Sequence, residues 1–295
     1  MDFKELKAKW QPQIEQTLQQ MIQEHVANEK LRDSMLYSLM AGGKRIRPLL
    51  VLATIDFFNQ PITSSAIEAS CCLEMVHTYS LIHDDLPCMD DDQLRRGKPT
   101  NHVVYGEAIA TLAGDALLTD AFYFLSELEL PAEQRVQLIG LLANAAGSQG
   151  MVSGQVNDLL GEHQALSLEQ IQHIHEQKTG ALISYAVQAG AILANRMNDL
   201  AVLNHYAHHF GLAFQIRDDI LDVTASADEI GKTPGKDVCE GKSTYPSQVG
   251  LGESYHLLAQ EIRDGLRDLS YLETQSGAVE HTALGSLIQQ LNLNE

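Results

Sequence analysis

The sequence has few cysteines, few basic residues and no long hydrophobic run. Its four cysteines, Cys71, Cys72, Cys88 and Cys239, form no CxxC spacing and no disulfide framework. This usage is typical of a reducing compartment, so we expect a cytoplasmic protein. No apolar run approaches the roughly 18 residues of a membrane span, and the start MDFKELKAKW is charged and amphipathic, unlike a signal peptide. We therefore expect no membrane insertion.

Positive charge is scarce overall but concentrated locally. The chain has 20 Lys and Arg against 39 Asp and Glu, a net charge of −19, which argues against binding of nucleic acids or anionic membranes. Half of the 20 basic residues fall into five short patches, most of them beside Gly or Pro. These patches are Lys44, Arg45 and Arg47; Arg95, Arg96 and Lys98; Lys178; Lys232 and Lys236; and Lys242. An acidic protein that holds an anionic ligand needs its positive charge focused in this way.

Helical periodicity dominates the hydrophobic pattern. Apolar residues make up 44 % of the sequence, enough for a large core, and no linker, repeat or low-complexity tract divides it. We therefore predict one all-α domain over residues 1–295. The expected helices, separated by Gly and Pro, are 2–26, 30–40, 48–58, 64–85, 107–127, 132–146, 149–160, 168–194, 199–223, 244–272 and 277–291. The longest irregular stretch, 224–243, has the length of a functional lid.

Two aspartate clusters are the most informative feature. DDLPCMD at 84–90 and DDILD at 218–222 each end an apolar, helix-periodic stretch. Carboxylates this close repel one another, by roughly 4 kcal/mol per pair at 4 Å and an effective dielectric near 20, so they need a counter-charge. Oxygen-only ligands favour magnesium, which usually completes its shell with phosphate oxygens. The clusters therefore predict two magnesium-binding walls with a phosphate between them.

Helix geometry orients both clusters. In the second, Gln215, Asp219 and Asp222 share one face, with Asp218 beside them. In the first, His77, Ser80 and Asp84 lie at i, i+3 and i+7 on one face. We expect Pro87 to end that helix, so that a non-helical link places Asp90.

Two further motifs involve glycine. GGKRIRP at 42–48 is a Gly loop that leads into a helix with Pro48 in its first turn, and Lys44, Arg45 and Arg47 would make it an anion site. It lacks the GxxxxGK[ST] spacing of a Walker A loop. Lys178-Thr179-Gly180 interrupts the helix expected at 168–194, where the glycine marks a kink.

In this order, the motifs resemble the trans-isoprenyl diphosphate synthases, most of all the short-chain bacterial farnesyl diphosphate synthases (geranyltranstransferases). The segments that carry the resemblance, from about 42 to 246, are GGKRIRP, HTYSLIHDDLPCMDDDQLRRGKPT, KTGAL, FQIRDDILD, GK and KSTYP. The resemblance implies an isoprenoid-synthase helical bundle around a deep central cavity, and a homodimer. It also implies condensation of isopentenyl diphosphate with allylic diphosphates, dimethylallyl and then geranyl, to give farnesyl diphosphate with Mg²⁺ as cofactor.

The resemblance also implies roles for individual residues. The magnesium ligands are Asp84, Asp85, Asp90, Asp218, Asp219 and Asp222. The allylic diphosphate contacts are Arg95, Lys178, Lys232 and Lys242, and the isopentenyl diphosphate contacts are Gly43, Lys44, Arg47, His77 and Arg96. Thr179 and Gln215 line the reacting region and, with Lys178 and Arg95, are the catalytic set. Tyr79 and Ser80, just before the first motif, determine chain length: an aromatic residue at the first of these positions accompanies fifteen-carbon products.

Several alternatives remain open at this stage. A geranyl or geranylgeranyl diphosphate synthase would carry nearly the same motifs. A terpene cyclase would share the first motif but usually has an Asn/Ser/Glu-type second metal motif. A calcium-binding module is disfavoured because no EF-hand spacing is present. A catalytically inactive helper subunit would typically lack one aspartate motif, and both are intact here.

Overall fold

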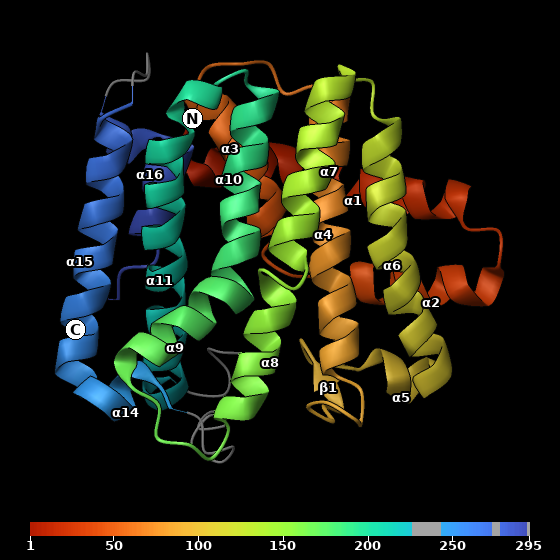
Figure 1. Ribbon diagram of the computed structural model, residues 1–295. Coiled ribbons are helices and arrows are strands. Elements are labelled where there is room, and N and C mark those ends of the chain that lie inside the picture. The colour runs from red at the N-terminus through yellow and green to blue at the C-terminus, as the bar shows by residue number, and fades with distance from the viewer. Residues whose placement is uncertain (226–242, 273–277, 294–295) are drawn as a thin grey trace.

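The computed structural model describes residues 1–225, 243–272 and 278–293, which are mostly helical (Figure 1). The helices are α1 (Phe3–His25), α2 (Glu29–Leu39), α3 (Ile46–Phe57), α4 (Ser64–Asp84), α5 (Asn101–Tyr105), α6 (Glu107–Glu127), α7 (Ala132–Ala146), α8 (Met151–Gly161), α9 (Leu168–His175), the π-helical turn η1 (Glu176–Gly180), α10 (Ala181–Leu193), the 3-10 turn η2 (Met197–Asp199), α11 (Leu200–Thr224), α14 (Tyr245–Val249), α15 (Leu251–Ser270), the 3-10 turn η3 (Val279–His281) and α16 (Ala283–Gln289). Strands β1 (Leu94–Arg95) and β2 (Lys98–Pro99) form one antiparallel hairpin.

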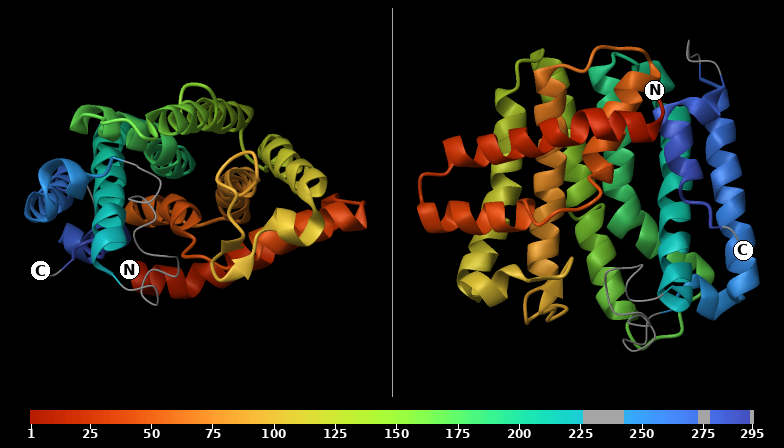
Figure 2. Two further views of the ribbon diagram at one scale, coloured as in Figure 1. Left: turned by 90° about the horizontal axis from the view of Figure 1, so that it is seen from below. Right: turned by 180° about the vertical axis from the view of Figure 1, so that it is seen from behind.

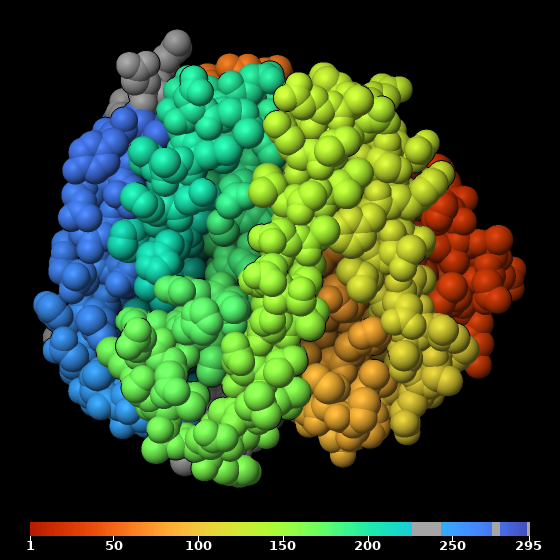
Figure 3. Space-filling view, viewed as in Figure 1, coloured from red at the N-terminus to blue at the C-terminus, as the bar shows by residue number. Residues whose placement is uncertain are grey.

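The long helices stand side by side, and α1 and α2 cross them on one face (Figure 2). Helices α3 and α10 are buried along most of their length, which explains why 49–55 and 182–192 read as nearly continuous apolar runs. Helices α6 to α9 form much of the face shown in Figure 3, beside α11 and α15. Each of α6 to α9 buries only part of its surface, and α6 and α8 expose apolar side chains such as Leu112 and Leu160.

The predicted helices agree with the observed ones best where caps and breakers are clear. The stretches 107–127 and 132–146 match α6 and α7 at both ends. The helix expected at 168–194 contains a π-helical turn at the predicted kink. The helix expected at 244–272 is divided at Gly250, whose φ of 82° suits glycine. Helix α5 and the hairpin were not predicted, because both are too short for a periodic signal.

Among the described residues, one helix, α6, is long and apolar enough to cross a membrane by length and composition. Its most apolar window has a mean hydropathy of 1.3 and is 33 % buried within the structure. The sequence-based expectation considered only uninterrupted apolar runs, and Asp115 and Asp120 divide the apolar residues of α6 into shorter ones.

Candidate active site

Helices α4 and α11 both end at the lower end of the molecule in Figure 1, beside β1 and α14 respectively. Helix α4 stops at Asp84, and Pro87 lies in the turns that follow. The backbone N–H of Asp90 then donates to the Asp84 carbonyl at 2.9 Å, which brings Asp90 back beneath the helix end. The predicted non-helical placement of Asp90 is therefore confirmed.

In the first cluster, Asp85 is paired with an arginine, whereas Asp84 is mainly desolvated. The buried Asp85 is bound by Arg95, whose Nε lies 2.8 and 2.9 Å from the two carboxylate oxygens and whose Nη2 lies 2.5 Å from Oδ1. Burial raises the pKa of Asp84 to about 6, while the charge of Lys178 lowers it and that of Asp90 raises it. Asp84 therefore carries negative charge that its surroundings only partly offset.

In the second cluster, Asp219 accepts hydrogen bonds from two neutral donors of the described residues. Gln215 Nε2 donates to Asp219 Oδ1 at 3.3 Å, and the backbone N–H of Tyr245 donates to Asp219 Oδ2 at 3.0 Å. Both oxygens of the buried Asp222 have no hydrogen-bond partner among the described residues. A carboxylate in this state needs an external counter-charge.

The π-helical turn η1 interacts with both clusters, through the charge of Lys178 and through a hydrogen bond of Thr179. Lys178 Nζ bonds Asp158 Oδ2 of α8 at 2.6 Å, and its charge also acts on Asp84 of the first cluster. Thr179 Oγ1 donates to Gln215 Oε1 at 3.3 Å, next to the second cluster. The turn thus connects residues of both walls, and π-helical segments occur frequently at functional sites.

The hairpin explains why two adjacent arginines can serve different ligands. Its two-residue turn, Arg96-Gly97, has φ of 54° and 74°, as a type I′ turn requires. Arg95 reaches Asp85, while Arg96 Nη1 donates to the Gly42 carbonyl. Gly43 has a φ of 129°, which strains any residue with a side chain, so the loop needs glycine beside the Arg96 guanidinium.

The 42–48 loop offers two of its three cations to a ligand. Partial burial and the charge of Arg217 lower the pKa of Lys44, while Asp218 raises it, so the loop faces the second wall. Arg47 Nη1 lies 3.2 Å from His77 Nε2. Burial and then the charge of Arg47 hold the pKa of His77 well below its usual range, which keeps the imidazole neutral.

Arg45 does not contribute to an anion site, contrary to the sequence-based expectation. Its side chain is buried, with Nη1 2.7 Å from Glu74 Oε1 and Nη2 2.5 Å from the Leu39 carbonyl. Arg45 therefore anchors the loop to α4. Glu74, an acid within the otherwise apolar CCLEMV run, is the sequence signal that could have revealed this pair.

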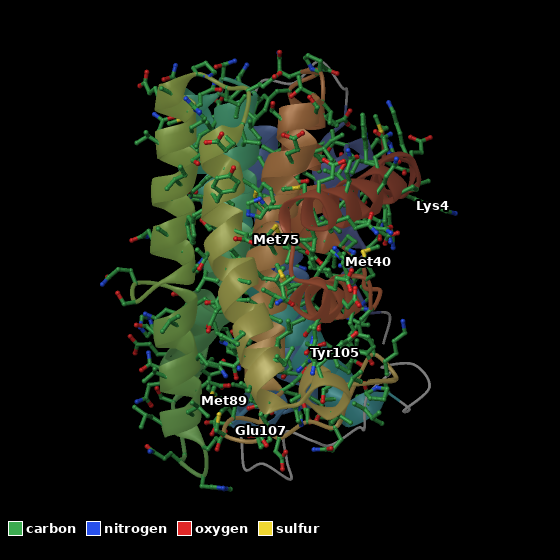
Figure 4. All side chains as sticks on the ribbon, turned by 90° about the vertical axis from the view of Figure 1, so that its right-hand side faces the viewer. Lys4, Met40, Met75, Met89, Tyr105 and Glu107 are labelled. Atoms are coloured by element: carbon green, nitrogen blue, oxygen red, sulfur yellow. The ribbon has the colours of Figure 1, made fainter. Side chains whose placement is uncertain are left out.

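The residues before the first motif lie along α4. Tyr79 is buried and packs edge-on against His83, with ring centroids 5.6 Å apart. Ser80 is half-buried and donates to the His77 carbonyl at 2.9 Å. Figure 4 shows Met75, fully buried, half-way along α4, and Met89 in the turn after it. The deep cavity that would run past these residues stays a prediction.

The donor set fits magnesium. No three Asp, Glu, His or Cys side chains of the described ranges converge into a ready-made metal site. Magnesium is often held by one or two carboxylates and completed by phosphate oxygens, so separate carboxylates on two walls suit it. The uncompensated negative charge comes from the desolvated Asp84 and from Asp222, which accepts no hydrogen bond from the part of the chain that the structure describes.

Some predicted residues lie outside the described part of the chain, and other residues were missed. Lys232, Lys242 and most of the 224–243 stretch are among the residues that the structure does not describe. Sequence reasoning missed Asp158, the partner of Lys178. Its spacing from Gly154 and Asn157 on one face of α8 is the available signal.

The comparisons with known proteins agree with this geometry. The family model described as Polyprenyl synthetase matches residues 28–273. The chain is 49 % identical over 251 residues to a farnesyl diphosphate synthase of Bacillus subtilis, covering 84 % of each chain. It is 45 % identical to a chloroplastic geranylgeranyl pyrophosphate synthase of Catharanthus roseus, covering 84 % of this chain and 71 % of that one. A geranyltransferase of Helicobacter pylori, solved with magnesium and isoprenyl diphosphate, superposes with a TM-score of 0.81 at 34 % identity over 93 % of each chain. The chain therefore belongs to the polyprenyl synthetase family.

Proposed function

We propose that this protein is a prenyltransferase that condenses isopentenyl diphosphate with dimethylallyl and then geranyl diphosphate to give (2E,6E)-farnesyl diphosphate. The observation that carries the proposal is the pair of acidic clusters, which η1 links because Lys178 acts on Asp84 and Thr179 bonds Gln215. The basic 42–48 loop, bonded by Arg96 at the Gly42 carbonyl, supplies the second anion site. An acidic pair that holds one diphosphate and a basic loop that holds another are what a two-diphosphate reaction needs. The farnesyl diphosphate synthase relative and the magnesium-bound structural neighbour support the same chemistry.

The proposed mechanism assigns the allylic diphosphate to the space between the clusters. Magnesium, when bound by Asp84, Asp85 and Asp90 and by Asp218, Asp219 and Asp222, would offset negative charge on the departing diphosphate. Arg95 and Lys178 hold the same group through charge-assisted hydrogen bonds, together with Lys232 and Lys242. Thr179 and Gln215 place their oxygens beside the allylic cation that remains.

Isopentenyl diphosphate belongs against Gly43, Lys44, Arg47, His77 and Arg96. The neutral His77 acts through Arg47, because its ring nitrogen accepts from the guanidinium and orients it. The double bond of isopentenyl diphosphate then attacks the allylic cation, and a proton passes to the released diphosphate. Exclusion of water protects the cation during this step.

Product length and assembly complete the proposal. Tyr79 and Ser80 of α4 bound the path of the growing chain, and Tyr79 ends it at fifteen carbons. We propose one domain that forms a homodimer in the cytoplasm and does not insert into the membrane. Val104 of α5, and Leu112 and Tyr123 of α6, expose between 47 and 54 % of their surface and offer an apolar face to the second copy.

A product assay tests the proposal. Purified protein is incubated with magnesium, isopentenyl diphosphate and dimethylallyl diphosphate, and the dephosphorylated products are sized by mass. A dominant fifteen-carbon alcohol is expected. A ten- or twenty-carbon alcohol would indicate a geranyl or geranylgeranyl diphosphate synthase, and the relative from Catharanthus roseus makes the latter the main alternative. A cyclic hydrocarbon or no product would refute the proposal.

A further inference from the structure

Helix α8 approaches the π-helical turn η1 more closely than a side chain would allow. A Cβ on Gly154 would lie 2.3 Å from the backbone nitrogen of Lys178 and 2.6 Å from its Cα. These atoms belong to backbone, which cannot move aside as the end of a flexible side chain can. Gly154 is therefore the point at which α8 and η1 meet.

Two polar side chains extend this contact along the same face of α8. Asn157 and Asp158 lie three and four residues after Gly154, the spacing that aligns side chains on a helix. Asn157 Nδ2 donates to Gln177 Oε1 at 2.8 Å, and Asp158 Oδ2 accepts from Lys178 Nζ at 2.6 Å. Gly154, Asn157 and Asp158 of α8 thus contact two consecutive residues of the turn, Gln177 and Lys178.

The turn needs such support because of its geometry. A π-helical turn is a rare conformation, seen mostly as single-turn bulges within α-helices. On its other sides, η1 contacts α11, where Thr179 bonds Gln215 and a Cβ on Gly211 would lie 3.4 Å from the Gly180 Cα. A loss of contact on the α8 side would let the turn shift relative to α11 and move Lys178 and Thr179 together.

We propose that Asn157, through its hydrogen bond to Gln177, is a positioning residue for prenyl transfer. It acts by holding η1, and thereby Lys178 and Thr179, against the two walls. The role rests on the proposed function, since Lys178 and Thr179 matter only if they face the reacting diphosphate. The Asn157–Gln177 pair is the better test than Asp158, because it is uncharged and leaves the charge balance around Lys178 unchanged.

Kinetics of four variants test the proposal. Asn157→Ala and Gln177→Ala should each lower kcat about tenfold, with the KM for isopentenyl diphosphate unchanged. The double variant should be no slower than either single variant, because both remove one interaction. Asn157→Gln keeps an uncharged amide donor on α8 and should retain more activity than Asn157→Ala.

A matched control and a second readout separate positioning from general loss of structure. Val156→Ala lies on the same helix, where Val156 is 49 % exposed, and should behave as the wild type. Hydrogen–deuterium exchange of amides 176–180 should accelerate in Asn157→Ala but not in Val156→Ala, with the thermal midpoint nearly unchanged.

Three outcomes would overturn the proposal. These are a normal kcat in Asn157→Ala, additive losses in the double variant, or a fall in the thermal midpoint with equal losses in every kinetic constant. A wild-type protein without prenyl transfer would refute the proposed function instead. In that case unchanged exchange at 176–180 in Asn157→Ala would separately refute the structural role of Asn157.

Gly154 provides an independent check on the same contact. Gly154→Ala should shift η1 and lower kcat at least as much as Asn157→Ala, because the new Cβ would overlap backbone. Gly140→Ala on α7, where a Cβ meets nothing within 4 Å, is the matched control and should leave kcat unchanged. Equal activity of the two variants would contradict the proposed contact.

Discussion

The two acidic walls differ in the hydrogen bonds that their carboxylates accept from the described residues. At the end of α4, Asp85 is bound by a full charge, the Arg95 guanidinium, over distances of 2.5 to 2.9 Å. At the end of α11, the hydrogen bonds that Asp219 accepts from described residues come from the Gln215 amide at 3.3 Å and the Tyr245 backbone N–H at 3.0 Å. A charged partner can be drawn away by an arriving diphosphate, whereas a backbone N–H cannot.

Each wall nevertheless leaves one carboxylate to an external cation. Asp84 is desolvated in the first wall, and Asp222 is buried in the second without a hydrogen-bond partner among the described residues. The contrast indicates a division of roles. Asp85 of the first wall can exchange its arginine partner when ligands bind, whereas the Tyr245 backbone N–H stays with Asp219 of the second wall.

The largest expected effect is on turnover when either wall loses a carboxylate. Asp84→Ala and Asp218→Ala should each reduce kcat by orders of magnitude, because both walls are needed to hold the metal and the diphosphate. Steady-state kinetics with unchanged circular dichroism would check this. Asp91→Asn, which removes an exposed charge beside the first cluster, is the control and should be nearly neutral. A near-normal rate in either alanine variant would contradict the two-wall arrangement.

The next effect concerns the product. Ser80→Phe should shift the main product from fifteen to ten carbons, because a ring one turn before Asp84 would fill the path of the growing chain. Mass analysis of the dephosphorylated products measures the shift. Ser80→Ala should keep the fifteen-carbon product. An unchanged distribution in Ser80→Phe would remove Ser80 from the wall of that path.

Stability should distinguish the charged donor to Asp85 from the neutral donors to Asp219. Arg95→Ala leaves the buried Asp85 unpaired and should lower the free energy of unfolding by about 1–3 kcal/mol without magnesium. Gln215→Ala removes two long hydrogen bonds, one with Thr179 and one with Asp219, and should cost about 1 kcal/mol, less than Arg95→Ala. Urea unfolding compares the two variants, and added magnesium should restore part of the loss only in Arg95→Ala. Equal losses would contradict the contrast between the walls.

The smallest effect is a pH dependence of stability that arises where α11 packs against α15. His209 of α11 bonds Glu261 of α15 at 2.6 Å and lies 3.5 Å from Asp268, with Asp264 and His208 also nearby. The hydrogen bond to Glu261 raises the pKa of His209 above its usual value, although burial lowers it. This stabilisation is therefore complete below the unfolded pKa of about 6.5 and is lost as pH rises through the folded pKa.

The difference in unfolding free energy between wild type and His209→Gln measures this term. It should amount to about 1 kcal/mol at pH 5.5 and should disappear at alkaline pH. His25→Gln on α1 is the comparison, because the His25 imidazole lies 3.7 Å from Asp120, farther than His209 from Glu261, and the substitution should have a smaller effect. A difference that does not change with pH would indicate that His209 acts by packing alone.

Much of the fold could be predicted because its signals are local. Helices α6 and α7 agree with the expected ranges at both ends, since glycine or proline precedes each of them and a periodic run follows. The shared face of Gln215, Asp219 and Asp222 also follows from helix geometry, and Gln215 does bond Asp219. The π-helical turn falls where Gly180 predicted a kink.

The remainder depends on contacts between distant segments. Arg45 reads as one of three equivalent cations, and only the packing of α4 against the loop shows that Glu74 binds it. The resemblance assigns Arg95 and Arg96 to different diphosphates, but the hairpin that directs them to Asp85 and Gly42 has strands too short to be predicted from sequence. Asp158 was not predicted because its partner, Lys178, lies on a different helix.

The π-helical turn determines how the faces of α9 and α10 are rotated relative to each other. A π turn holds about one residue more than the α turn it replaces, so it acts as a single-residue insertion. Each residue of an α-helix rotates the chain by about 100°. Deletion of one residue within 176–180 would therefore let α9 and α10 fuse into a regular helix and turn α9 by about a quarter of a revolution. The ring of His175, now stacked on Tyr245 at 5.9 Å, would then face another neighbour.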